Sequence, residues 1–292
     1  GRPGFDGFFA QNNGDFRVRI AINSFGLRNP KSVEAAHGQI WVIGDSMSFG
    51  WGVRREESYA EVTERMLGMP VYNLSSPGAN VCHYQAFAAR MPDGLLPRAV
   101  VVGLVMENDI ARYDCARGNG PHTAPTVATD SSPISLTSIK VFLMRWSALY
   151  NVLAESLKQV NVVNEALMAI GFLKRPHAYH GHLNTNNFDS SANSTADEIV
   201  HLKSMLPAGT PFAILIVPAR FDIRDDAADY ADLRTRVIEA LAERGIHAID
   251  PSEGFRKAGF KETHFAHDGH WSPLGHEIAG KNLAAWVRKA LP

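Results

Sequence analysis

The sequence predicts an α/β fold, a three-layer α/β/α sandwich around a five-stranded parallel sheet, with a loop and helical insertion. Short runs of apolar, β-prone residues alternate along the chain with amphipathic helical patterns. The apolar runs are continuous rather than alternating, which is typical of strands covered by helices on both faces. Small polar residues and glycines follow several of these runs, and in such sheets reactive groups gather beyond the carboxyl ends of the strands.

The elements follow one another in a regular order. The predicted strands are residues 39–44, 70–74, 99–105, 212–218 and 246–250. The predicted helices are residues 58–68, 81–91, 230–245 and 273–291. The last helix has a clear start signal, since Ser272 can cap it and Pro273 can open it.

One region interrupts this alternation. Residues 114–140 are rich in Gly, Pro, Ser and Thr and are expected to form a long loop. Residues 141–173 have a helical apolar stripe, which favours packing on the sheet or capping of a cleft over a membrane-facing role. The polar residues 174–198 are expected to be a surface excursion. We expect one domain over residues 1–292, with residues 112–200 as an insertion or cap region.

Composition excludes several classes of protein. With 45% hydrophobic and 20% charged residues, the 292-residue chain can bury a large core. A net charge of -1, from 29 basic and 30 acidic residues, argues against nucleic acid or anionic lipid as partner. No stretch approaches the roughly 20 apolar residues that span a bilayer. The first residues, GRPGFDGFF, lack the features of a signal peptide, so we expect a processed or trimmed chain.

The stretch IWVIGDSMSFG ends a predicted buried strand with Ser46. A nucleophilic serine needs this placement, exposed at the end of a rigid strand beside a base and hydrogen-bond donors. The alternative is a simple turn, because Gly, Asp and Ser all favour turns. The stretch is not a Gly-x-Ser-x-Gly nucleophile elbow, because Ser48 occupies the last glycine position.

Later strand ends carry groups that fit a catalytic serine. Gly78 follows the second strand and can offer an uncrowded backbone N–H, while Asn108 follows the third and can offer a side-chain amide. Asp268 and His270 precede the last helix. Each residue alone also has a structural interpretation, since Gly78 can simply form a turn and Asn108 can cap the start of a helix.

The order of these residues resembles the SGNH (GDSL) hydrolase superfamily, whose fold is also described as flavodoxin-like. GDSMSFGWG is similar to the first block of that family, SSPGAN to the second, MENDI to the third and DGHWSPLGH to the fifth. The upstream INSFGLRNP is similar to a segment that often precedes the first block in bacterial members. The likeness covers residues 22–109 and 212–290. The DGHW form resembles bacterial branches that include polysaccharide O-acetyltransferases and esterases.

The resemblance implies a role for each residue. Ser46 would be the nucleophile, His270 the general base and acid, and Asp268 the group that orients the imidazole. The backbone N–H groups of Ser46 and Gly78 and the amide of Asn108 would form the oxyanion hole. The spacing Asp-x-His departs from the usual Asp-x-x-His, because the third residue after Asp268 is a tryptophan. This leaves the contact between Asp268 and His270 open, with Asp250 as a weaker substitute.

Histidines and cysteines raise two further questions. His264, His267 and His270 are three residues apart, and a second group comprises His177, His180 and His182, but neither matches a recognised ligand spacing. We therefore expect no metal and no cofactor. His276 is expected on a helix surface or as a packing partner. Cys82 and Cys115 follow neighbouring strands and either form a disulfide or remain reduced thiols.

These observations predict an enzyme, a serine esterase that removes small acyl groups, most simply acetyl, from a carbohydrate or related ester. One alternative is an O-acetyltransferase that modifies an extracytoplasmic polysaccharide. A second is a catalytically idle carbohydrate-binding protein that keeps the fold. The expected partner is an acylated small molecule or carbohydrate, without stable membrane insertion, and a disulfide would favour a periplasmic or secreted location.

Overall fold

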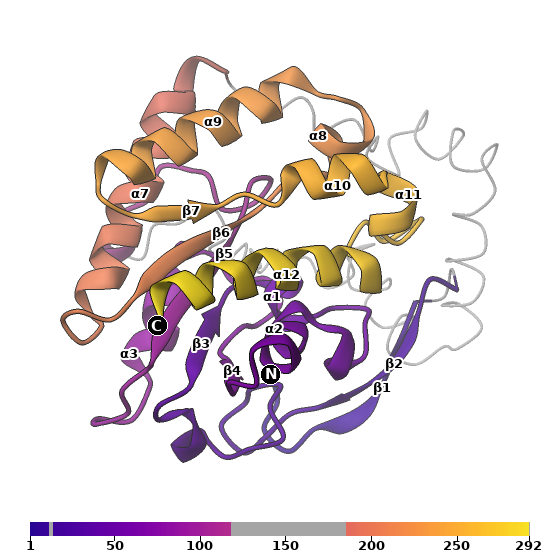
Figure 1. Cartoon of the computed structure of the whole chain (residues 1–292), viewed down its shortest axis with the longest axis vertical. Coiled ribbons are helices and arrows are strands. Elements are labelled where there is room, and N and C mark those ends of the chain that lie inside the picture. The colour runs from indigo at the N-terminus through magenta and orange to yellow at the C-terminus, as the bar shows by residue number, and fades with distance from the viewer. Residues whose placement is uncertain (12–13, 118–184, 292) are drawn as a thin grey trace, which may run out of the picture.

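The computed structural model describes residues 1–11, 14–117 and 185–291. Their centre is a five-stranded sheet with the strand order β4-β3-β5-β6-β7 (Figure 1). The strands are β3 (Ile40–Ile43), β4 (Val71–Asn73), β5 (Ala99–Val105), β6 (Phe212–Val217) and β7 (His247–Ile249). All neighbouring strands in this sheet pair in parallel. The predicted α/β class and five-stranded parallel sheet are therefore confirmed.

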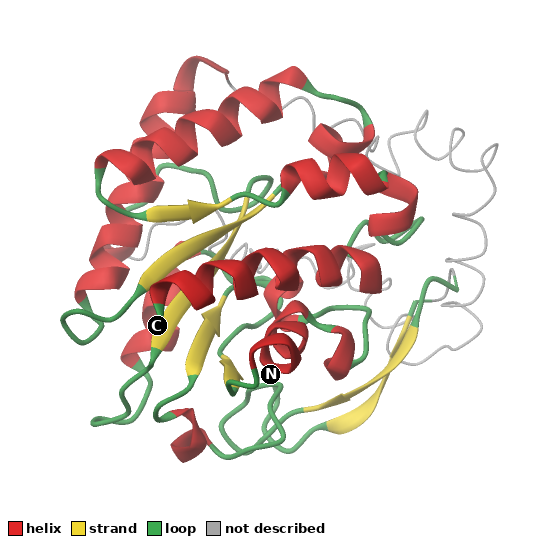
Figure 2. Cartoon of the chain, viewed as in Figure 1, coloured by secondary structure: helices red, strands yellow, loops and turns green. Residues whose placement is uncertain are grey.

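Alternating side chains of the strands face two separate cores. On one face, Trp41, Val102 and Ile214 pack against three helices. These helices are α3 (Val81–Ala89), α7 (Phe188–Ser204) and α9 (Ala228–Glu243). On the other face, Val42, Val101 and Leu215 pack against a second set of helices. That set comprises α2 (Tyr59–Leu67), α10 (Ser252–Ala258) and α12 (Pro273–Ala290). Helices thus cover both faces of the sheet (Figure 2).

The helix α7 corrects one prediction. Residues 174–198 were expected to be a surface excursion, but α7 begins at Phe188 and packs against α3 and α9. Its buried side chains recur at helical spacing and include Ala192, Thr195 and Ile199. Small or polar residues make up half of this buried stripe, which hid the helical pattern in the sequence. Residues 118–184, including the predicted helices at 141–173 and four of the twelve histidines, lie outside the described residues.

Near the N-terminus lies an antiparallel hairpin that the sequence reading did not identify. It consists of β1 (Asp6–Ala10) and β2 (Arg17–Ala21) and lies apart from the main sheet, near α2 (Figure 1). Buried Val18 and Ile20 of β2 alternate with exposed arginines, so one face of the hairpin packs on the protein and the other faces outward. The inward face joins Phe16 and Phe49 in a small third core, beside Trp51.

Several shorter helices connect these elements, and four of them lie near the sites discussed below. They are α1 (Ser46–Phe49), α8 (Arg220–Arg224), α11 (Phe260–Thr263) and the 3-10 turn η2 (Arg55–Glu57). Two of them, α1 and α8, directly follow β3 and β6 at the carboxyl edge of the sheet. Among the helices of the described residues, none is long and apolar enough to cross a membrane.

Candidate active site

Ser46 is the first residue of α1, directly beyond the carboxyl end of β3. The preceding Asp45 is buried and caps the helix, accepting a hydrogen bond of 2.8 Å from the backbone N–H of Met47. Burial raises the pKa of Asp45, and the hydrogen bond from Met47 and the charge of His270 oppose that rise. The helix is a single turn, so its position depends on contacts with its surroundings.

The small residues around α1 let it approach the sheet closely. Ser48 packs directly against Gly44, at the end of β3, and Gly103 in β5. A Cβ atom added at Gly44 would lie 2.1 Å from the hydroxyl oxygen of Ser48, and one added at Gly103 would lie 2.3 Å from it, so only glycine fits at these two positions. That hydroxyl accepts a hydrogen bond of 2.7 Å from Tyr59 in α2. Asn73 at the end of β4 donates a hydrogen bond of 2.7 Å to the carbonyl of Ser48. The serine that replaces the elbow glycine therefore anchors the turn that carries Ser46.

His270 and Asp268 lie next to Ser46. The Nε2 atom of His270 is 2.8 Å from Oγ of Ser46, and Nδ1 of His270 is in hydrogen-bond contact with Oδ1 of Asp268. Gly269 adopts a φ of +80°, in the left-handed region that favours glycine. This turn brings the imidazole back onto the Asp268 carboxylate across the short Asp-x-His spacing. Asp250 instead pairs with Arg234, so it is not part of this group.

The environment of Asp268 favours its charged form. Burial alone would raise the pKa of its carboxyl, but hydrogen bonds from His270 and Gln11 outweigh burial and lower the pKa below its ordinary value. Nε2 of Gln11 donates to Oδ2 of Asp268 over 2.5 Å. An ionised Asp268 can fix the imidazole tautomer that leaves Nε2 free to accept the proton of Ser46.

Two residues from the N-terminal hairpin hold the loop that carries Asp268 and His270. Gln11 follows β1, and Asp15 precedes β2. The carboxylate of Asp15 accepts hydrogen bonds from the backbone N–H groups of His267, at 3.0 Å, and Asp268, at 2.8 Å. It also contacts Nδ1 of His267 at 2.8 Å. These two residues were missed in the sequence, where they lie more than 250 positions from their partners and no local pattern marks them.

A small cavity of about 70 Å³ opens at Ser46. Its lining includes His270, Asn108, Glu107 and Arg220. Both carboxylate oxygens of Glu107 hold Arg220, one accepting from its backbone N–H at 2.6 Å and the other from Nε at 2.9 Å. This pair was also missed, although Glu107 is adjacent to Asn108 in the sequence.

Asn108 can reach the cavity because a network fixes the turn after β5. The neighbouring Asp109 is fully buried and accepts hydrogen bonds of 2.8 Å from Tyr84 and from the backbone of Val105. Burial, together with the nearby charge of Asp45, raises the pKa of Asp109 well above its ordinary value. The turn is thus held from α3 and from β5, with Asn108 left exposed.

Gly78 is less directly placed. It lies in the loop after β4, where the backbone N–H of Ser76 donates to the carbonyl of Gly44. Gly78 has a φ of +76° and is exposed. In the described part of the chain it is not among the residues that line the cavity at Ser46. Its role as an oxyanion donor stays a prediction.

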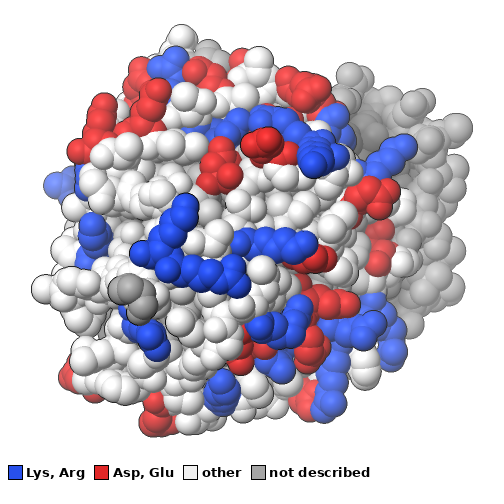
Figure 3. Space-filling model, viewed as in Figure 1, with Lys and Arg blue, Asp and Glu red and all other residues white. Residues whose placement is uncertain are grey.

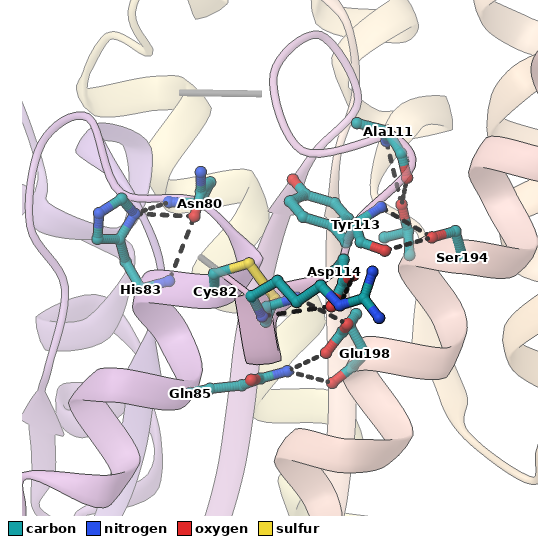
Figure 4. Close-up of a disulfide and its surroundings, with 12 residues drawn as sticks. Asn80, Cys82, His83, Gln85, Ala111, Tyr113, Asp114, Ser194 and Glu198 are labelled. Atoms are coloured by element: carbon teal, nitrogen blue, oxygen red, sulfur yellow. Dashed lines mark hydrogen bonds and ion pairs between the residues drawn. A yellow bond between two sulfur atoms is a disulfide. The ribbon is translucent and has the colours of Figure 1, made fainter. Parts of the chain in front are cut away.

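Cys82 and Cys115 form a disulfide between α3 and the loop after β5 (Figure 4). Glu198 of α7 contacts both sides of this link. Its carboxylate accepts from the backbone N–H of Cys115 at 3.2 Å and from the amide of Gln85 at 2.6 Å. The disulfide therefore joins the helix that follows β4 to the segment that follows β5. The expectation that the two preceding strands are neighbours was wrong, because β3 lies between them.

The three histidines of the HFAHDGH stretch have different surroundings. His264 is buried beside Phe260, and burial lowers its pKa to about 4. His267 is paired with Asp15, and only His270 contacts Ser46. Within the described ranges, no group of three or more potential ligands is arranged to hold a metal ion. His276 is a packing partner, fully buried in α12.

Three solved structures illustrate what the chain is similar to. A structure of TesA matches with a TM-score of 0.48 and 13% identity, covering 87% of this chain and 99% of that one. A Corynascus thermopiles carbohydrate esterase family 2 enzyme with a carbohydrate-binding domain matches with a TM-score of 0.47 and 14% identity, covering 87% and 66%. The lipase/acylhydrolase from Enterococcus faecalis matches with a TM-score of 0.48 and 13% identity, covering 86% and 96%.

No protein-family model matches the chain, and no curated protein matches it. The structural likenesses are too distant to carry an inference about activity. What the site can do therefore rests on the contacts among Ser46, His270 and Asp268.

Proposed function

We propose that the protein is a serine acyl-transfer enzyme, an esterase that resembles the SGNH (GDSL) hydrolases in its sequence motifs. The observation that carries the proposal is the contact of 2.8 Å between Oγ of Ser46 and Nε2 of His270, with Nδ1 of His270 against Asp268. A hydroxyl, a base and a carboxylate that orients the base are the arrangement that activates a serine.

The reaction follows from these atoms. His270 takes the proton of Ser46 as Oγ attacks the ester carbonyl, and the negative charge develops on the carbonyl oxygen. The amide of Asn108, with the backbone N–H groups of Ser46 and Gly78, stabilises this oxyanion. The imidazolium then protonates the departing alcohol, and an acyl-serine remains. Water, activated by the same imidazole, releases the acid and restores Ser46.

The site favours a small acyl group. The cavity of about 70 Å³ is far below the 300–1,000 Å³ of typical small-molecule sites. Part of its wall is polar, formed by Asn108, Glu107 and Arg220, which suits a carbohydrate ester better than a lipid. We therefore propose acetyl esters of carbohydrates as the substrate class. The disulfide supports an extracytoplasmic location, because such bonds persist in oxidising compartments.

The test is turnover of p-nitrophenyl acetate by wild type, Ser46→Ala and His270→Ala. We expect each substitution to lower kcat by at least about a thousandfold, because the triad acts as a unit. Ser204→Ala and His201→Ala, at exposed positions in α7, provide matched controls and should retain full activity. Equal turnover by wild type and Ser46→Ala would refute the proposal.

The same assay separates hydrolysis from transfer. Addition of a xylo-oligosaccharide, followed by mass spectrometry of the sugar, shows where the acetyl group goes. Free acetate without acetylated sugar supports the esterase. Acetylated sugar formed by wild type and not by Ser46→Ala would instead assign an O-acetyltransferase.

A further inference from the structure

A cavity of about 560 Å³ lies between the β1–β2 hairpin and the η2 turn. It shares no lining residue with the cavity at Ser46. Five of its lining residues are arginines: Arg17, Arg19, Arg28, Arg54 and Arg55. Basic side chains, with some acidic ones among them, also gather on the part of the surface occupied by the hairpin (Figure 3). We name this space the arginine cavity.

Carboxylates neutralise only some of these arginines. The ion pairs are Arg19 with Asp6 at 2.5 Å, Arg54 with Glu57 at 3.7 Å, and Arg55 with Glu56 at 3.5 Å and with Glu61. Of the described residues, no carboxylate lies within ion-pair range of Arg17 or Arg28. The arginine cavity therefore keeps positive charge that its own wall does not neutralise by contact.

Arg28 is the buried arginine of the cavity, with 3% of its surface exposed. Its guanidinium donates hydrogen bonds to the carbonyls of Phe49, Gly50 and Val53, at 2.5 to 3.1 Å. Burial lowers its pKa to about 10, which reflects the cost of holding this charge away from water. The charges of nearby glutamates already offset part of that cost, and an anion in the cavity would offset more of it.

Arg17 offers a different contact surface. Its guanidinium lies 4.1 Å above the ring of Phe8, and Phe8 is 58% exposed. An exposed aromatic ring beside a guanidinium presents an apolar surface next to a donor fork. A sugar ring that bears a carboxylate has the complementary parts, an apolar C–H face and an anionic group.

We propose that the arginine cavity binds an acidic saccharide chain, one whose sugars carry carboxylates. Guanidinium groups pair bidentately with planar carboxylates, which favours this anion. The volume of 560 Å³ is in the range of small-molecule sites, and a single inorganic anion would fill only a small part of it. This assignment does not depend on the activity of Ser46, because the two cavities share no lining residue.

The cavity is nevertheless linked to the candidate catalytic turn. Arg28 contacts the carbonyls of Phe49, which ends α1, and of Gly50, which follows it. Ser46 begins the same four-residue helix. A saccharide chain bound to the arginines would therefore be held one short helix away from the proposed nucleophile.

The test is isothermal titration calorimetry of the full chain with an oligogalacturonate and with a neutral xylo-oligosaccharide of the same length. We expect binding of the acidic chain alone, weakened by added salt. The double variant Arg17→Gln/Arg54→Gln should weaken binding at least about tenfold. Its melting temperature and its turnover of p-nitrophenyl acetate should match those of wild type, because both side chains are exposed.

A control with the same loss of charge is Lys203→Gln/Arg236→Gln, on α7 and α9, and it should bind as wild type does. The proposal is overturned if wild type does not bind the acidic chain at millimolar concentration, or if both double variants weaken binding equally. Equal affinity for inorganic phosphate would also overturn it, since the cavity would then be a simple anion site. Ser46→Ala should bind normally. A wild type that binds the acidic chain but does not turn over the ester would refute only the proposed function.

Discussion

Replacing Gln11 by leucine tests whether the N-terminal hairpin is part of the catalytic machinery. The change removes the donor that lies 2.5 Å from Oδ2 of Asp268 and keeps a side chain of similar size. Asp268 keeps its contact with Nδ1 of His270, and its backbone N–H keeps the hydrogen bond that it donates to the carboxylate of Asp15. We expect the protein to fold, with the carboxylate free to turn away from the imidazole.

The size of the effect follows from the hydrogen bond that is lost. A hydrogen bond to a charged group contributes about 1.5 to 3 kcal/mol, and each 1.4 kcal/mol corresponds to about tenfold in rate. Gln11 acts through Asp268 rather than on the reacting atoms, so we expect the lower end, about a tenfold loss in kcat with KM unchanged.

The pH profile separates positioning from a general loss of stability. Gln11 helps to lower the pKa of Asp268, so its loss should raise that pKa. With the higher pKa, Asp268 is protonated at a higher pH than in wild type, so the acid limb of kcat/KM should move to higher pH. The assay is p-nitrophenyl acetate turnover across pH.

Gln85→Leu is the matched control. It removes the hydrogen bonds that the side-chain amide of Gln85 in α3 donates to Glu198 in α7. We expect it to change the melting temperature without moving the acid limb. If Gln11→Leu has wild-type kcat/KM and an unmoved acid limb, the hairpin has no positioning role and this reasoning is refuted.

Three further predictions concern the remaining parts of the structure. Asn108→Ala should lower kcat on p-nitrophenyl acetate by about a hundredfold with unchanged melting temperature, and wild-type kcat would remove Asn108 from the oxyanion hole. Cys82→Ser/Cys115→Ser should lower the free energy of unfolding, measured in urea titrations, by about 3–4 kcal/mol. This magnitude follows from the sequence separation of 33 between the two cysteines. An unchanged urea midpoint under non-reducing conditions would contradict this. His276 is neutral in the folded protein because burial lowers its pKa to about 3, while the unfolded chain takes up that proton near pH 6.5. Folding stability should therefore fall as pH drops from 6.5 toward 3. Urea titrations of His276→Asn at several pH values should show a smaller loss of stability over this range. Parallel curves of stability against pH for the two proteins would argue against this.

The strands could be predicted because parallel strands are buried on both faces and appear in the sequence as unbroken apolar runs. The run AVVVGLV coincides with β5, from Ala99 to Val105, and the run FAILIV with β6. Ser46, Asn108, Asp268 and His270 stand out for a related reason, since each follows or lies close to a strand end or helix start that the sequence marks clearly.

The missed features depend on contacts between distant segments. Nothing near Gln11 or Asp15 indicates that they contact Asp268, because the contact exists only after β1–β2 has folded against the loop before α12. The same holds for Glu107 and Arg220, which are 113 residues apart. The helix α7 was missed for a compositional reason, since its buried stripe includes Ala192, Thr195 and Ala196 among polar neighbours.

The central claim is that Ser46 is an activated nucleophile. The most direct measurement is intact-protein mass spectrometry after treatment with a fluorophosphonate, followed by peptide mapping. We predict a single phosphonyl adduct on the peptide that contains Ser46, absent in Ser46→Ala and formed much more slowly in His270→Ala. No adduct on wild type, or an adduct that persists on another residue in Ser46→Ala, would contradict the claim.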